Sequence, residues 1–568
     1  MADSQSTASS IQNFSGLGIA VEPARTTQAE ELAKSDLWIF REGRRDVPGA
    51  TFLNDLRQRL SSRNGSVDCL IQAGELETAL ADSGSLSAST AASLTNCLAD
   101  RLYAAKCGNG QDPEDILNHI EPSASITISP PEGFTYYALH PLDFARVAER
   151  IADEIPVYAV IGIRSIGTTL SAVVVAALNK RGNSATRITV RPKGHPYSRE
   201  MQLLATEKEW IADQISKTAH FLIVDEGPGR SGSTFLSVAE ALCHQGVSPE
   251  RITIIGSRQF DPESLCAEGA PARWRKFRFL AASSSMNERF SRWTYLGGGD
   301  WRMYFCGSEQ NWPESWTQME RFKVLSPDRR EVVKFEGMGR IGEEARHRAF
   351  VLAGAGFSPA VHDAGNGFLS YATIASGKHL QKSDLSTAIL EQIARYYAFR
   401  NAEFHHSSPA NPELEHMVTF NVQQEFGREL KLEAGALSSA NTVVVDGRVQ
   451  PYEWIVAEDG KLLKMDAISH GDNHFFPGPC NIAWDLAGTM VEWELDRQAS
   501  EFLLNAFRKL SGIDLSSELN AYLLSYCVFR LGFCKMARST VLGSREELRL
   551  DSAYHRYRSA AEAILRSF

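Results

Sequence analysis

The sequence predicts a multidomain fold in which an α/β domain with a parallel sheet is followed by an α+β domain. Three observations lead to this prediction. The chain has 568 residues, more than one hydrophobic core usually organises. Apolar segments alternate with helix-length segments between residues 157 and 281, as in parallel sheets. Beyond residue 311, strand-like segments come first and helical segments follow, an order typical of α+β domains.

The order of these segments defines four predicted regions. We expect residues 1–30, rich in Ser, Thr, Gln and Ala, to be disordered. Residues 31–128 carry apolar side chains at helical spacing and form a predicted helical N-terminal region. The parallel-sheet domain is predicted over residues 129–310, and the α+β domain over residues 311–568.

Composition narrows the class of protein. A formal net charge of -10, with 43% hydrophobic and 23% charged residues, is ordinary for a globular protein and disfavours a nucleic-acid partner. The opening MADSQSTASS lacks the parts of a secretory signal, and the longest apolar run, AVVVAAL, is too short to span a membrane. Nine cysteines without C-x-x-C spacing indicate reduced thiols, without a disulfide framework or zinc site. We therefore expect a cytoplasmic protein without a membrane partner.

Five apolar segments form the predicted parallel sheet. They are VYAVIGI (157–163), TRITV (186–190), HFLIVDE (220–226), RITIIGS (251–257) and RKFRFLA (275–281). Helix-length segments separate the first four, which predicts right-handed crossovers. In such sheets, ligands bind at the carboxyl ends of the strands.

The third of these segments ends in two acids followed by a glycine-rich turn. Asp225 and Glu226 can accept hydrogen bonds from vicinal ribose hydroxyls. The turn that follows opens a helix, where free backbone N–H groups and the positive end of the helix dipole favour a phosphate. Its residues are Arg230, Ser231, Gly232, Ser233 and Thr234. The stretch therefore predicts a site for a ribosyl phosphate.

This stretch resembles the phosphoribosyl pyrophosphate (PRPP) loop of type I phosphoribosyltransferases. The resemblance extends over roughly residues 130–285 and implies phosphoribosyl transfer with Mg²⁺ and PRPP, with Asp225 and Glu226 as catalytic residues. The family's pyrophosphate-binding loop falls on Arg164, Ser165, Gly167 and Thr168. Glu226 departs from the usual second Asp, and Arg230 stands where many members carry an acid or a small residue.

The C-terminal half carries a second group of candidate residues. Lys334 alternates with valines on the second strand of a predicted hairpin, RFKVL-SPDRR-EVVKFEG. A strand seldom buries an unpaired lysine, and Glu343 or Glu344 on the following helix could be its partner. Asp446 and Asp466 each end an apolar strand more than 100 residues later. A strand lysine with two such carboxylates is what phosphoryl transfer from Mg-ATP requires.

These residues are similar to those of the aminoglycoside-phosphotransferase and protein-kinase-like family, whose fold is bilobal. The resemblance implies that Lys334 and Glu344 bind ATP and that Asp446 is the catalytic-loop Asp. It makes Asp466 a metal ligand, and Asp485 in WDLAG the acid that supports the catalytic loop. Glu453 falls near the metal-binding Asn, and Val445 replaces the usual His.

Two other assignments stay open in this region. His470-Gly471-Asp472 spells the family's catalytic tripeptide, which would make Asp485 the metal ligand. The proline-rich gap between Asp472 and Asp485 leaves no room for a hairpin, so we rank it second. His470, Asp472 and His474 could also bind a metal, although an i, i+4 pair outside a helix is more often solvated loop.

Together, these observations predict a bifunctional transferase of nucleotide or ribosyl metabolism. One domain would transfer a phosphoribosyl group and the other would phosphorylate a small-molecule hydroxyl with ATP. The expected partners are ATP, a ribosyl phosphate and a nucleoside or base-like acceptor, and homo-oligomerisation is left open. The alternatives are a nucleotide-sensing regulator with silent domains, and a kinase-only enzyme that acts on an antibiotic or a sugar.

Overall fold

A computed structural model describes most of the chain, in two compact units. The described residues are 44–62, 66–104, 111–195, 197–374, 376–406, 412–433, 435–437, 441–471, 473 and 475–568. Unit 1 comprises residues 44–292 with 338–340, and unit 2 comprises residues 293–337 and 341–568. The expected disorder of residues 1–30 and the assignments to Asp472 and His474 fall outside the described residues.

Unit 1 is built around the predicted parallel sheet. Its strands are β3 (Val157–Ile163), β4 (Ser184–Val190), β7 (His220–Val224), β8 (Ile252–Gly256) and β9 (Arg278–Ala281), in the order β4-β3-β7-β8-β9. All four pairings are parallel, which confirms the predicted sheet. Every residue of β7 and β8 is buried, because helices cover both faces of such a sheet and leave their strands apolar throughout.

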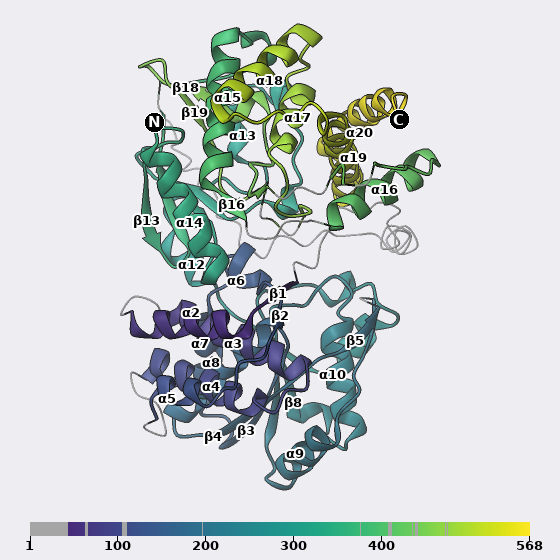
Figure 1. The fold of residues 1–568 in the computed structure, drawn as a ribbon. Coiled ribbons are helices and arrows are strands. Elements are labelled where there is room, and N and C mark those ends of the chain that lie inside the picture. Colours follow the sequence, from purple (N-terminus) through teal and green to yellow (C-terminus); the bar gives the residue numbers. More distant parts are fainter. Residues whose placement is uncertain are drawn as a thin grey trace, which may run out of the picture. The chain divides into compact units, whose positions relative to one another are not determined.

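Helices pack on both sides of this sheet (Figure 1). They are α7 (Pro141–Ile151), α8 (Ile166–Lys180), α9 (Ala205–Ser216) and α10 (Ser233–His244), with the shorter α6 (Glu132–Tyr136), α11 (Ala270–Trp274) and α12 (Ser285–Arg289). A hairpin of β5 (Lys193–His195) and β6 (Ser198–Glu200) follows β4.

The N-terminal helices belong to the same unit as the sheet. They are α2 (Gly49–Ser61), α3 (Ser66–Asp82), α4 (Ala88–Ala104) and α5 (Pro113–Asn118), flanked by the paired strands β1 (Arg45–Val47) and β2 (Ile126–Ile128). Both α3 and α4 pack on α8. The approach of α3 is so close that a Cβ atom added to Gly74 would lie 2.0 Å from Thr169 Oγ1. Buried Glu77 also pairs with Arg187 of β4, with 2.7 Å between Oε2 and Nη2.

Unit 2 begins with an antiparallel sheet in the order β10-β11-β12-β14-β13. Its strands are β10 (Thr294–Tyr295), β11 (Lys323–Leu325), β12 (Glu331–Phe335), β13 (Val361–Gly365) and β14 (Phe368–Ala372). The predicted hairpin is present, because Lys323 of β11 lies opposite Lys334 of β12. Helix α14 (Gly339–Gly354) connects β12 to β13.

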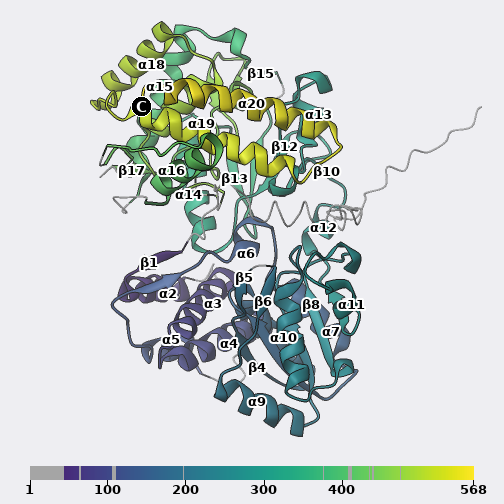
Figure 2. The same ribbon diagram turned by 90° about the vertical axis from the view of Figure 1, so that its right-hand side faces the viewer.

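The rest of unit 2 is mainly helical. Its helices are α13 (Trp301–Phe305), α15 (Thr387–Glu403), α16 (Pro412–Phe426), α17 (Ala483–Glu492), α18 (Arg497–Ser511), α19 (Leu519–Arg538) and α20 (Arg545–Leu565). The last two lie side by side (Figure 2). Short strands are β15 (Lys378–His379), β16 (His405–His406), β17 (Thr442–Val443), β18 (Trp454–Val456) and β19 (Leu462–Lys464), of which β18 and β19 form a hairpin.

The structure also bears on the expectations about membrane spans and cysteines. Among the described helices, none combines the length and apolar character that crossing a bilayer requires. The expectation of nine reduced thiols was wrong, because Cys97 is disulfide-bonded. Seven other described cysteines form no disulfide bond.

Candidate functional site

The centre of the site in unit 2 is the amino group of Lys334. Strand β12 directs this side chain inward, and it is only 6% exposed. Its Nζ forms ion pairs with Asp466 and, at 3.2 Å, with Glu336, and donates a hydrogen bond to Ser469 at 3.2 Å. Glu344 lies exposed on α14. The carboxylates that pair with Lys334 are therefore Glu336 and Asp466, where the sequence suggested Glu343 or Glu344.

Mutual attraction keeps Lys334 and Asp466 ionised despite their burial. Burial alone would lower the pKa of Lys334, but the carboxylates of Asp466 and Glu336 outweigh it and raise that pKa. Burial likewise opposes ionisation of Asp466, yet the charge of Lys334 holds its pKa well below the usual range. His470 lies 3.3 Å from Asp466, and burial followed by the charge of Arg448 lowers its pKa to about 3. The imidazole is therefore neutral at physiological pH.

Asp446 forms a second cluster, which is completely buried. The hydroxyl of Tyr396 donates a hydrogen bond to its Oδ2 at 2.5 Å. Lys464 of β19, also fully buried, lies 3.4 Å from Asp446 Oδ1 and 3.6 Å from Glu453 Oε2. Lys464 thus joins two of the predicted site residues. The sequence did not single out Lys464, although it sits two residues before Asp466.

Asp485 holds the loop that carries Asp446. Its carboxylate accepts hydrogen bonds from the backbone N–H groups of Asp446, at 2.8 Å, and Gly447, at 3.0 Å. Asp485 belongs to the first turn of α17 and is fully buried. Asp485 therefore supports the loop that carries Asp446, as the resemblance of the WDLAG segment implied.

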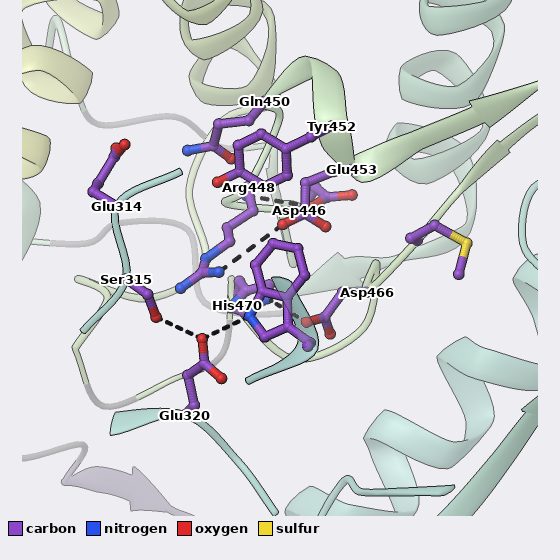
Figure 3. Close-up of polar contacts among 12 residues, drawn as sticks. Glu314, Ser315, Glu320, Asp446, Arg448, Gln450, Tyr452, Glu453, Asp466 and His470 are labelled. Atoms are coloured by element: carbon purple, nitrogen blue, oxygen red, sulfur yellow. Dashed lines mark hydrogen bonds and ion pairs between the residues drawn. The ribbon is translucent and has the colours of Figure 1, made fainter. Parts of the chain in front are cut away.

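A small cavity of about 60 Å³ opens beside Lys334 and Asp466. The charged or titratable side chains that line it include Glu320, Arg321, Lys323, Arg448, His470 and Arg530, and its apolar wall includes Trp316, Phe475, Phe476, Phe529 and Phe533. Figure 3 shows the Arg448 side chain extending from the Asp446 loop toward Ser315 and Glu320. Sequence reasoning missed Arg448 and Arg530. Arg448 stands only two residues after Asp446, which was a usable signal.

Glu453 lies near both clusters of unit 2. Its carboxylate is 6% exposed and lies 3.9 Å from the guanidinium of Arg448. Burial raises the pKa of Glu453, and the nearby negative charge of Asp466 adds to this while Lys464 opposes it. Glu453 is therefore harder to ionise than Asp466.

In unit 1, the predicted acid pair lies at the carboxyl end of β7. Burial raises the pKa of Asp225 to about 7. Burial, followed by the negative charges of Glu132 and Asp225, raises the pKa of Glu226 to about 8. Both side chains therefore hold protons readily at neutral pH and would lose them to a bound cation or a positively charged ligand.

The turn after this pair leads directly into α10. Gly232 caps the helix with φ +70°, a left-handed conformation that favours glycine. The hydroxyls of Ser231 and Ser233 lie 3.0 Å apart, and Arg230 is exposed. Thr234, the second residue of α10, completes the predicted phosphate loop.

The second predicted loop of unit 1 contacts the N-terminal helices. Arg164 follows β3, and its Nε lies 2.9 Å from the carboxylate of Asp82, the last residue of α3. Arg191 pairs with the same carboxylate. Thr168 is buried and shares a 2.9 Å hydrogen bond with Thr78. Ser165 and Gly167 lie between Arg164 and Thr168, at the start of α8.

Comparisons with known proteins give structural neighbours only. No known family profile matches the chain, and no curated protein matches it. The choline kinase of Streptococcus pneumoniae is similar over 49% of this chain and 98% of its own, with a TM-score of 0.32 and 13% identity. A choline/ethanolamine kinase family protein from Mesorhizobium loti matches over 43% and 85%, with a TM-score of 0.27 and 14% identity. The ethanolamine kinase of Plasmodium vivax matches over 44% and 81%, with a TM-score of 0.30 and 10% identity. At these TM-scores the similarities carry no functional argument.

Proposed function

We propose that this protein is an ATP-dependent kinase that phosphorylates a hydroxyl group of a small molecule, with its active site in unit 2. The observation that carries the proposal is the buried ion-pair cluster of Lys334 with Asp466 and Glu336 beside a cavity. A lysine and a carboxylate at such a position can hold nucleotide phosphates and a metal ion. Kinase activity without phosphoribosyl transfer is sufficient to account for this cluster.

The residues of unit 2 fit Mg²⁺ through Asp466. Mg²⁺ is usually bound by one or two carboxylates, with phosphate oxygens and water as the other ligands. The low pKa of Asp466 keeps it ionised for this role, whereas the raised pKa of Glu453 makes it a secondary candidate. Mg²⁺ would neutralise charge on the nucleotide phosphates.

In the proposed reaction, the acceptor hydroxyl oxygen attacks the γ-phosphorus of ATP. A new O–P bond forms, the bond from that phosphorus to the β–γ bridging oxygen breaks, and ADP leaves. The hydroxyl proton passes to Asp446. Because Asp446 is 0% exposed, the acceptor hydroxyl must replace the hydrogen bond from Tyr396 or the contact with Lys464.

The direct test is nucleotide binding followed by phosphate transfer. Isothermal titration calorimetry with Mg-ATP is expected to show binding to the wild type and its loss in Lys334→Ala. Lys461→Ala is the matched control, because Lys461 is exposed and pairs with Asp459 in the turn between β18 and β19. Transfer from labelled ATP is then screened against ribosyl compounds, sugars, hydroxy acids, aminoglycosides and choline. Equal binding by the wild type and Lys334→Ala would contradict the proposal.

A second candidate function concerns unit 1, where Asp225 and Glu226 precede the glycine turn of α10. We propose this edge of the sheet as a ribosyl-phosphate site, with Arg164 and Thr168 on the adjoining loop. Titration with Mg-PRPP is expected to show binding that Asp225→Ala/Glu226→Ala abolishes. Undetectable PRPP binding by the wild type would leave unit 2 as the seat of activity.

A further inference from the structure

The cations that line the cavity of unit 2 differ in how well they are neutralised. Lys334 pairs with Asp466 and Glu336, and Lys323 lies 3.3 Å from Glu320. Arg530 lies 2.9 Å from Glu314 and 3.7 Å from Glu492. Each of these three therefore has a carboxylate within hydrogen-bond range.

Arg448 differs from these cations. Arg321 also lines the cavity and lies 3.8 Å from its carboxylate partner, Glu336, but it donates a hydrogen bond to the Glu336 carbonyl at 2.7 Å. The carboxylate closest to Arg448 is that of Glu453, at 3.9 Å, which is at the limit of an ion pair. Across the residues that the structure describes, no hydrogen bond from the Arg448 guanidinium group is present, although that group carries five N–H donors. The side chain is 21% exposed, so most of its surface faces protein atoms.

A second donor lines the same cavity. Trp316 is 6% exposed, and its indole N–H has no acceptor among the described residues. A buried donor without an acceptor loses the hydrogen bond that it would make to water and gains none in return. A buried indole N–H without an acceptor and a guanidinium group without a hydrogen bond, both at one cavity, point to a ligand that brings acceptor oxygens.

The size of the cavity restricts the part of a ligand that enters it. Its volume of about 60 Å³ is well below the roughly 300 Å³ at which whole-ligand pockets begin. It has room for one small oxyanion or a few water molecules. The rings of Phe475, Phe529 and Phe533 form an apolar wall, against which the carbon skeleton next to that oxyanion can pack.

We propose that Arg448 binds a carboxylate or phosphate group of the acceptor, with the Trp316 indole N–H as the second donor. The acceptor class is therefore a hydroxyl compound that bears an acidic group. Arg530 adds positive charge to this subsite, while its own N–H groups remain bound to Glu314 and Tyr557. This assignment rests on the proposed kinase function and names the substrate class of the same site.

The first experiment uses inorganic phosphate as the probe, titrated calorimetrically into the full chain. The wild type is expected to bind phosphate, and Arg448→Gln to bind it at least about tenfold more weakly, because hydrogen bonds between two charged groups are stronger than those between neutral groups. Arg448→Lys should keep part of the affinity for phosphate, since it keeps the positive charge but loses the paired N–H donors of the guanidinium group. Trp316→Phe should weaken binding several-fold. The control, Arg497→Gln, changes an arginine that is 93% exposed on α18 and should bind phosphate as the wild type does.

The second experiment separates the acceptor from the nucleotide as the source of the oxyanion. If the oxyanion belongs to the acceptor, phosphate binds in the presence of saturating Mg-ADP, and Arg448→Gln keeps the wild-type affinity for Mg-ATP. If Arg448→Gln weakens Mg-ATP but not Mg-ADP, the ligand of Arg448 is the terminal phosphate of the nucleotide, and the assignment is overturned.

Two further outcomes distinguish this inference from the kinase proposal. A wild type that binds phosphate but no nucleotide refutes the kinase proposal, and with it the assignment of the oxyanion to a kinase acceptor. A wild type that binds Mg-ATP but no phosphate at millimolar concentration, or phosphate binding unchanged in Arg448→Gln, refutes the subsite alone. Circular dichroism of each variant shows that it is folded.

Discussion

The carboxylate of Asp485 accepts a hydrogen bond from the backbone N–H of Asp446 at 2.8 Å. The two carboxylates are both fully buried, and the charge of Asp446 contributes to the raised pKa of Asp485. The residue that supports the loop is thus electrostatically linked to the residue that we propose as the proton acceptor. This link has a measurable pH dependence.

We expect Asp485→Asn to change how stability depends on pH. Burial, and next the charge of Asp446, raises the pKa of Asp485 to about 7. Between about pH 4 and pH 7, the folded protein therefore holds a proton that the unfolded chain has released, so stability from this group falls as pH rises. The wild type should lose stability relative to Asp485→Asn across this window, with a constant difference above it. Thermal unfolding midpoints at several pH values measure this, and parallel pH profiles would contradict it.

Asp446→Asn should lower kcat by about 10²- to 10⁴-fold, the usual contribution of a proton acceptor. The affinity for Mg-ATP should stay close to that of the wild type, because Lys334 and Asp466 are untouched. The measurement is steady-state kinetics with the acceptor that the transfer screen identifies. Asp459→Asn, in the exposed turn between β18 and β19, is the matched control. A parallel loss of nucleotide affinity would show that Asp446 is needed for the structure of the site instead.

Glu77→Ala should destabilise unit 1 by about 3–5 kcal/mol, since it leaves the Arg187 charge buried without its partner. The side chains of this pair are only 3% and 2% exposed. Replacing both residues, as Glu77→Leu/Arg187→Met, should cost less than the single change. Hydrogen exchange of peptides from α3 and β4 localises the effect. The control is Asp153→Ala, which breaks the ion pair of Asp153 with Arg181. The Asp153 side chain is 83% exposed, so this change should hardly alter the stability of unit 1.

Asp225 and Glu226 should both be protonated at pH 6 and lose their protons near pH 7 and pH 8. Infrared absorption of protonated carboxyl groups can follow this titration. The signal lost between pH 6 and pH 9 should be absent from Asp225→Asn/Glu226→Gln. As the folded protein holds these protons after the unfolded chain has released them, the wild type should also become less stable relative to the variant as pH rises toward 8. Titration near pH 4 in the folded protein would refute the raised pKa values.

The parts of the fold that the sequence predicted are those with strong local patterns. Strands β3, β7 and β8 are continuous apolar runs. Such runs indicate a sheet that is covered on both faces, because a sheet with one exposed face would show alternating polar residues. The hairpin of β11 and β12 was predictable because its turn, SPDRR, separates two alternating segments.

The parts that could not be predicted depend on contacts between distant segments. Lys334 meets Asp466 across 132 positions, and Arg302 meets Glu546 across 244. No local pattern reports such pairs. Glu336 was within reach of sequence reasoning, because residues two apart on a strand share one face. Arg530 joins the cavity of unit 2 only because α19 packs against the loops that follow β19.

The close contact of Gly74 with Thr169 makes the packing of α3 on the start of α8 sensitive to any side chain added at position 74. A single methyl group at position 74 would lie where the Thr169 hydroxyl now sits, and would wedge α3 away from α8. Asp82 at the end of α3 would move with it and release the guanidinium groups of Arg164 and Arg191. The smallest possible side-chain change would thus deprive two arginines of the carboxylate that they share, without altering any charged residue.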